Sequence, residues 1–384
     1  MLSDCREDDL LAIADAVASQ PDGEAAIRFT ACASAEFTTA ESGFAHRALS
    51  YLLLEGLVEV LTTNWDDCIE RGAPRERVAG VVNESDLLRM VGRSVLKIHG
   101  CATQPSTVLI TSEHLAEPPT WVVDEIRARV GNSVIVFVGI GDIAGYVEKR
   151  LRDAVEAVGD ADNVRVVSPS IVNTWEDSQW AAVLPGLPSD HRIPQTADEF
   201  LDDLASAHII AGLQEIVATF SSEAEMSTRL ELAVTAIGNH DCERVLRWLR
   251  RCAVVPKKGE SVLRCHPLPT LLAAVGQLGG ESFEIGSDGL VHAGETSYQV
   301  LAATTPVPWA RVWREASIRL EALISLGCPP GAAPVFLVAG GQGTKPAAGP
   351  LPNDILGGGD QFDIVGGPAN AVPKCLTADE VLAG

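Results

Sequence analysis

The chain has 384 residues, of which 46% are hydrophobic and 21% are charged, a balance that is typical of packed globular proteins and excludes a disordered chain. It carries 52 acidic against 29 basic side chains, which gives a formal net charge of -23. So acidic a chain offers no basic face to a polyanion, and we expect no direct binding of nucleic acid.

The first 205 residues alternate between helical patterns and short apolar runs. Apolar residues at helical spacing predict helices at residues 8–19, 43–55 and 146–158. Runs of β-branched and apolar residues predict strands at residues 58–63, 94–98, 133–138 and 164–168. The run at 133–138 shows no polar alternation, which is typical of a strand covered on both faces. Strands that alternate with helices predict an α/β fold with a doubly wound, mostly parallel, Rossmann-like sheet.

The composition shifts to Pro, Gly and Ser around residues 185–194, before a second region. We expect a first domain over residues 1–205, a smaller α+β domain over residues 206–340 and a Gly/Pro-rich tail over residues 341–384. The elements predicted after the shift are helices at 197–220, 222–237, 241–252 and 268–277, strands at 283–285, 289–293 and 297–302, a helix at 309–326 and a strand at 334–339.

The cysteines and the N-terminus indicate the compartment. The nine cysteines are scattered and form no C-x-x-C pair, which is typical of reduced thiols. The first residues are acidic where a signal peptide would be basic, and no apolar run reaches membrane-spanning length. The sequence therefore predicts a cytoplasmic protein without a membrane anchor.

Three polar clusters follow three of the predicted strands. They read TTNWD at residues 62–66, KIHG at residues 97–100 and GIGD at residues 139–142. Because ligands bind at the carboxyl ends of the strands in such sheets, the three clusters can line one crevice. Taken singly, each also has an ordinary explanation: Asx residues and His-Gly pairs are common in turns, and the glycines miss the G-x-G-x-x-G spacing.

In this chain order, the clusters resemble those of the sirtuin-like family, in particular the bacterial SIR2-like domains that hydrolyse NAD in antiviral defence. That family carries a T-[TQ]-N-x-D turn, then an H-G pair and later a G-x-S-like turn. The resemblance covers about residues 44–170. It implies a SIR2-like fold with NAD as the substrate, and it implies that Asn64 and His99 are the catalytic residues.

These side chains suit cleavage of the bond between nicotinamide and ribose. Cleavage develops positive charge on the ribose, so the site must orient the sugar and hold the leaving amide. Asn64 can bond a ribose hydroxyl or place the attacking water, and His99 can take a proton near neutral pH. The remaining residues that we expect to contact NAD are Thr62, Thr63, Asp66, Gly139, Gly141 and Asp142.

The chain departs from the family in two ways. Sirtuin-like proteins carry a strand and a G-A-G-x-S phosphate loop well upstream of the T-x-N turn, and no such motif precedes residue 62 here. We expect either a reading frame that begins further upstream or a loss of the loop, which would weaken NAD binding. Protein deacylases of the family carry a zinc module of paired C-x-x-C motifs, so deacylation is disfavoured and we expect no metal.

The second domain is similar to the core of restriction-endonuclease-like nucleases in its order of helix, three strands, helix and strand. There an Asp on the second strand and an E-x-K on the third bind metal and position water. Asp288 lies near the start of the second predicted strand, but residues 299–301 read Gln-Val-Leu where E-x-K belongs. We therefore expect no nuclease catalysis.

Two functions remain open. The first is an NAD+ glycohydrolase of the SIR2-like type, acting as an antiphage effector that depletes NAD. The second is a catalytically inactive SIR2-like module that senses a nucleotide or serves in assembly, with a degenerate nuclease-like domain for interaction. The expected partners are NAD or ADP-ribose, together with a second copy of the chain or a protein of the same defence system.

Overall fold

The computed structural model divides into two compact units, Met1–Leu204 and Ala205–Gly384. The residues that it describes are 10–34, 36–73, 78–89, 93–130, 133–140, 145–158, 161–171, 175–176, 178–252, 261–328, 333–342 and 372–384. Within these ranges, none of the helices combines the length and the apolar character that a membrane crossing needs.

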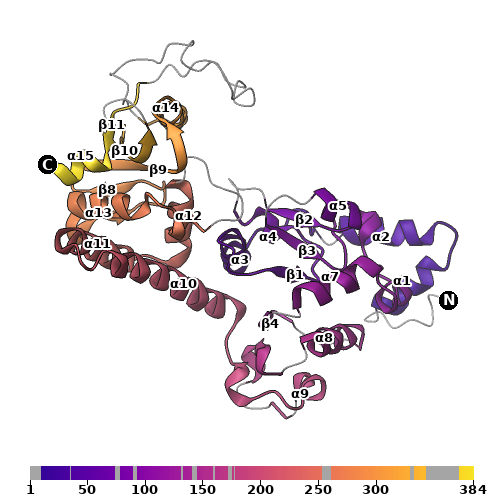
Figure 1. Ribbon diagram of the computed structural model, residues 1–384. Helices are drawn as coiled ribbons and strands as arrows, with labels where there is room; N and C mark the ends of the chain where they lie inside the picture. The colour runs from indigo at the N-terminus through magenta and orange to yellow at the C-terminus, as the bar shows by residue number, and fades with distance from the viewer. Residues whose placement is uncertain are drawn as a thin grey trace. The chain divides into compact units, whose positions relative to one another are not determined.

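The described residues of the first unit form two three-stranded sheets, and every strand pair in them is parallel (Figure 1). The first sheet has the order β1 (Val60–Thr62), β3 (Ser94–Lys97), β2 (Ala79–Val81), and the second the order β4 (Ile135–Val138), β5 (Val164–Val167), β6 (Arg192–Ile193). The helices are α1 (Leu10–Ala18), α2 (Gly23–Ser34), α3 (Phe44–Leu54), α4 (Cys68–Arg71), α5 (Glu84–Arg89), α6 (Ser112–Ala116), α7 (Thr120–Val130), α8 (Gly145–Val158) and α9 (Gln179–Val183).

The parallel pairing agrees with the sequence prediction, but the described residues form two sheets where the sequence predicts one. Within them, β1 pairs only with β3 and β4 only with β5. The expected cover on both faces of β4 is wrong as well. Val134 and Val136 are 57% and 36% exposed, while Phe137 on the opposite face is 9% exposed. A run of apolar residues therefore identified the strand but not how much of it is covered.

One hydrophobic core joins the two sheets of this unit. It includes Ile126 of α7, Phe137 of β4 and Val166 of β5. Leu61 of β1 and Ile98, which directly follows β3, pack into the same cluster. The carboxyl ends of β1, β3 and β4 are therefore anchored to a common core, and this is what positions the three polar clusters.

The second unit is built on a five-stranded mixed sheet of order β11-β10-β9-β8-β7. β8 is antiparallel to both of its neighbours, and β10 is parallel to both of its own. Figure 1 shows α14 on one side of this sheet and α13 and α11 on the other. The boundary between the units falls within α10 (Ala197–Thr219). The other elements of the second unit are α11 (Ala224–Ile237), α12 (Cys242–Cys252), α13 (Leu268–Gly279), β7 (Glu284–Ile285), β8 (Val291–Ala293), β9 (Thr296–Pro308), α14 (Trp309–Ser325), β10 (Val335–Gln342), β11 (Cys375–Thr377) and α15 (Ala378–Ala383).

We expected residues 341–384 to form a tail, but both ends of this segment belong to the second unit. Gly341 and Gln342 belong to β10, and β11 extends the sheet as a further parallel strand. Thr377 caps the following helix α15 by accepting a hydrogen bond from the Glu380 backbone N–H at 2.9 Å. Gln277 Nε2 of α13 donates to the Val381 carbonyl at 2.8 Å, so this segment is part of the packed unit. The Gly/Pro-rich stretch at 343–371 lies outside the described residues.

Candidate functional site

The TTNWD cluster forms a turn between β1 and α4. The Asn64 backbone N–H donates to Thr62 Oγ1 at 3.0 Å, and Asp66 Oδ1 accepts from the Cys68 backbone N–H at 3.0 Å. These two bonds define the path of the turn, because side chains of Thr and Asp commonly satisfy nearby backbone donors in this way. Thr63 and Asn64 are exposed and Asp66 is half-buried. The Asn64 amide is therefore available to a ligand.

The KIHG cluster forms a tighter turn after β3. His99 is buried, with 8% of its surface exposed, and its carbonyl accepts from the Leu109 backbone N–H at 3.0 Å. Gly100 has a φ of +85°, and a Cβ at this position would overlap the Thr107 carbonyl. Only glycine meets both conditions, so Gly100 fixes the direction in which the chain leaves His99.

Backbone hydrogen bonds join these two turns to each other. The Ile98 N–H donates to the Thr62 carbonyl at 3.0 Å, and the Ala102 N–H donates to the Trp65 carbonyl at 2.8 Å. The structure therefore brings the Asn64 turn and the His99 turn together at the carboxyl ends of two neighbouring parallel strands.

The GIGD cluster follows β4 and is described only in its first half. Gly139 has a φ of +69°, and no atom lies within 4 Å of the place that a Cβ would occupy. Ile140 packs into the same core cluster as Leu61 and Ile98. Gly141 and Asp142 lie outside the described residues. The start of this third turn therefore packs on the same hydrophobic core as the strands that lead into the other two turns.

Lys97 and Glu70 form an ion pair next to the Asn64 turn. Lys97 belongs to the KIHG cluster but received no role from the sequence, and Glu70 lies outside the three clusters. The Lys97 side chain is fully buried, its Nζ donates to the Asp66 carbonyl, and it lies 3.3 Å from Glu70 Oε1. Burial raises the pKa of the Glu70 carboxyl, and the nearby Lys97 opposes this effect. A lysine that ends an otherwise apolar strand run is the one sequence signal of this pair.

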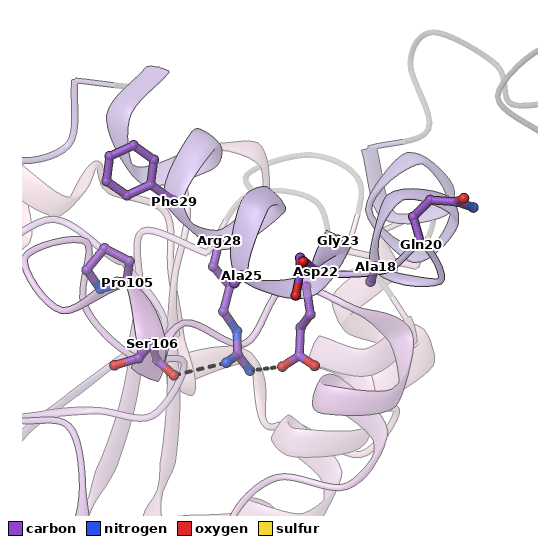
Figure 2. A pocket seen from close by; sticks show the side chains of 10 residues that line it. Ala18, Gln20, Asp22, Gly23, Ala25, Arg28, Phe29, Pro105 and Ser106 are labelled. Atoms are coloured by element: carbon purple, nitrogen blue, oxygen red, sulfur yellow. Dashed lines mark hydrogen bonds and ion pairs between the residues drawn. The ribbon is translucent and has the colours of Figure 1, made fainter.

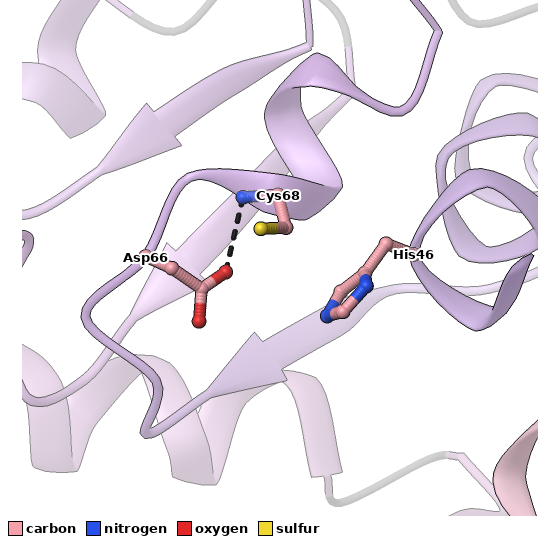
Figure 3. Close-up of side chains that lie close together, drawn as sticks. All are labelled: His46, Asp66 and Cys68. Carbon is pink, nitrogen blue, oxygen red and sulfur yellow. Dashed lines mark hydrogen bonds between the residues drawn. The ribbon is translucent and has the colours of Figure 1, made fainter. Parts of the chain in front are cut away.

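His46 was also missed; it lies on α3, close to Asp66 and Cys68 (Figure 3). One potential ligand atom from each of the three residues lies within 4.8 Å of the others. Burial and the Asp66 carboxylate raise the pKa of the Cys68 thiol to about 11. His46 Nδ1 accepts the Gly43 N–H at 3.1 Å, which places the proton of a neutral ring on Nε2.

This protonation pattern decides what the three side chains can do. Zinc binding needs a free lone pair on the imidazole nitrogen and a deprotonated thiol. As arranged, the thiol and the Nε2–H are both hydrogen-bond donors beside a carboxylate. The cluster therefore suits hydrogen bonding around Asp66. Zinc binding through Nε2 would require a deprotonated thiol and a shift of the imidazole proton to Nδ1, which would break the hydrogen bond from the Gly43 N–H.

A pocket of about 740 Å³ lies elsewhere in the first unit, between the end of α1, the start of α2 and residues 105–106 (Figure 2). Arg28 in this pocket donates to the Ser106 carbonyl at 3.1 Å and pairs with Glu24 at 3.0 Å. None of the residues that line it belongs to the three polar clusters. Its one lining cation is already paired, so the pocket offers no free positive charge to a phosphate.

Comparison with known proteins gives one match. A family model described as the SIR2-like domain matches residues 58–181. This segment is a SIR2-like domain. It contains all three polar clusters and the strands β1 to β5, so the resemblance inferred from the clusters is confirmed. No curated protein and no solved structure matches the chain significantly. The whole second unit lies outside the SIR2-like match.

Proposed function

We propose that the SIR2-like domain is an NAD+ glycohydrolase that works at the ends of β1 and β3. The observation that carries this proposal is the hydrogen-bonded contact between the Asn64 turn and the His99 turn, through Ile98 N–H to Thr62 O and Ala102 N–H to Trp65 O. An exposed amide and a buried imidazole then flank one strand-end site. Sirtuin-like domains use NAD as their substrate, which supports the choice of ligand.

In the proposed reaction the bond between nicotinamide and the ribose C1′ breaks, and nicotinamide leaves with the bonding electron pair. Asn64 holds a ribose hydroxyl or the attacking water, and the Asp66 carboxylate opposes the positive charge that develops on the ribose. Water adds to C1′ and gives its proton to His99, so the products are nicotinamide, ADP-ribose and a proton. Thr62, Thr63 and the backbone at Gly139 are proposed contacts of the dinucleotide, together with Gly141 and Asp142.

Turnover by purified variants tests this assignment. We expect the full chain to release nicotinamide from NAD+, and Asn64→Ala and His99→Ala each to lose about 10²–10⁴ in rate, as removal of a general base or an orienting group does. Asn239→Ala, which changes an exposed asparagine of the second unit, is the control and should keep full activity. Full activity in both site variants would show that the reaction occurs elsewhere.

A second candidate is a SIR2-like module that binds NAD or ADP-ribose without turnover, with the second unit as an interaction domain. Its support is the order of the elements in the second unit. The order α13, β7, β8, β9, α14, β10 follows the nuclease-like order, which favours a degenerate nuclease-like domain. Asp288 lies in the turn before β8, where its Oδ1 accepts the Leu290 N–H at 3.0 Å, and Gln299 is buried in β9. Calorimetric titration that finds NAD affinity without nicotinamide release would favour this candidate.

A further inference from the structure

Lys97 occupies a position in which burial of a charged side chain costs free energy. It ends the central strand of the sheet β1-β3-β2, and none of its side chain is exposed. Removing an ammonium group from water costs several kcal/mol unless a counter-charge and hydrogen bonds replace its hydration. Glu70 Oε1 at 3.3 Å supplies the charge, and the Asp66 carbonyl supplies a hydrogen bond.

Glu70 pairs with Lys97 through one carboxylate oxygen, but its other oxygen does not share in the pairing. Its side chain is 11% exposed, and its Oε2 is buried without a hydrogen-bond partner among the described residues. Gly80 on β2 leaves the room for the pair, since a Cβ there would lie 2.7 Å from Glu70 Oε1 and 3.3 Å from Lys97 Cδ. Apolar side chains of similar size would often be as stable in such a slot. Stability alone therefore does not account for the pair.

The atom that Lys97 holds belongs to the turn that presents Asn64. Two successive carbonyls of this turn are bonded to the segment around His99: the Trp65 carbonyl accepts from the Ala102 N–H at 2.8 Å, and the Asp66 carbonyl accepts from Lys97 Nζ. Because the Asn64 side chain is exposed, its place relative to His99 depends on these backbone bonds. A small displacement of a reacting group can cost about a hundredfold in rate.

We propose that Lys97 is a positioning residue, which through the Asp66 carbonyl fixes the Asn64 turn relative to His99, and that Glu70 keeps its ammonium group in place. The expected effect of Lys97 on turnover rests on the proposed function. Its expected effect on the stability of the turn does not.

The test uses a charge-free double variant and a matched single variant of the full chain. Lys97→Met with Glu70→Gln removes the bond to Asp66 without leaving a buried charge unpaired. Glu70→Gln alone keeps the lysine as a donor to the Asp66 carbonyl but removes the counter-charge beside its ammonium group. Amide hydrogen exchange is measured at residues 63–68 and at Ala102, with α3 and β3 as internal references, and kcat and KM for NAD+ are measured in parallel.

In the double variant we expect amide exchange in the turn to rise by about tenfold or more, because the turn can open without first breaking the bond between Lys97 and the Asp66 carbonyl. Exchange in α3 and β3 should stay unchanged. We also expect kcat to fall by about tenfold to a hundredfold with KM within about threefold. Glu70→Gln should fall between the wild type and the double variant in both measurements, because Lys97 can still reach the Asp66 carbonyl but has lost the counter-charge that keeps its ammonium group in place. Unchanged exchange in the turn of the double variant would overturn the proposal.

Two further outcomes are decisive. If the wild type does not hydrolyse NAD+, the proposed function fails, and the exchange measurement still decides the positioning role of Lys97. If the double variant does not fold, Gly80→Ala replaces it, because the added Cβ presses on Glu70 Oε1 and Lys97 Cδ. Faster exchange at residues 63–68 then supports the proposal, and wild-type exchange there contradicts it.

Discussion

His240, in the turn between α11 and α12, accepts a hydrogen bond from the Ile285 backbone N–H of β7 at 3.2 Å. Burial and the charge of Arg244 lower the pKa of His240. A histidine with a lowered pKa in the folded state contributes stability that is present above its ordinary pKa of about 6.5 and is lost as the pH falls through the lowered pKa. A protonated imidazole cannot accept the Ile285 bond.

We therefore expect the free energy of unfolding to fall as the pH drops through the ordinary histidine pKa of about 6.5 and on through the lowered pKa of His240. The loss should match that of one hydrogen bond, about 1 kcal/mol. The measurement is the free energy of unfolding against pH, compared with His240→Gln, which has no charge to gain. The free energy of unfolding should fall more in the wild type than in His240→Gln over this pH range. Parallel profiles would show that His240 does not titrate as the structure indicates.

Asn64 and His99 could be proposed from the sequence because each is a polar residue directly after a predicted apolar strand, where parallel sheets place their ligands. Lys97, Glu70 and His46 could not be assigned in this way. Their roles depend on contacts that only the folded chain creates. Lys97 and His46 lie close to Asp66, and Glu70 pairs with Lys97. The raised pKa of Glu70 likewise follows from burial, which sequence spacing does not reveal.

At the level of elements, α13 and α11 approach so closely that one residue between them must be glycine. A Cβ on Gly276 of α13 would overlap the Arg229 carbonyl of α11 and lie 3.2 Å from the Ala233 nitrogen. We expect Gly276→Ala to lower the free energy of unfolding by about 1–3 kcal/mol, because overpacking forces backbone shifts.

Gly238→Ala is the matched control for this prediction. Gly238 ends α11 with a φ of −61°. A Cβ added there would have the Val234 carbonyl oxygen as its nearest neighbour, at 3.4 Å. We expect this change to be neutral or stabilising by about 0.4–1 kcal/mol, since alanine fits the conformation and restricts the unfolded chain. Equal losses in both variants, measured by chemical denaturation, would rule out a special contact at Gly276.

Elements with a clear apolar period were predicted well. The helix predicted at residues 146–158 is α8, the strand at 94–98 is β3, and the helix at 309–326 is α14. The elements that were missed lack such a pattern: α2 leaves Phe29 66% exposed, and β6 has only two residues. β11 was hidden because a Gly/Pro-rich stretch precedes it, and its strand character depends on pairing with β10.

At the scale of the whole molecule, the chain combines a parallel α/β unit that carries the SIR2-like domain with a separate mixed-sheet unit. We propose that in a cell its NAD+ hydrolysis serves antiphage defence by emptying the NAD pool. Infected bacteria that express the chain should then lose NAD, and those that express His99→Ala should not. NAD levels that stay constant in both strains would remove the support for a defence role.

The central claim is that Asn64 and His99 form the working site of an NAD+ hydrolase. The most direct measurement is the rate of nicotinamide release by the full chain and by His99→Ala at saturating NAD+, with the dissociation constant of each measured by calorimetry. We predict that the rate of the variant falls by about 10²–10⁴ while its affinity stays within about threefold, because the lost group acts on the proton and not on binding. No release by the wild type, or equal rates in the two proteins, would contradict the claim.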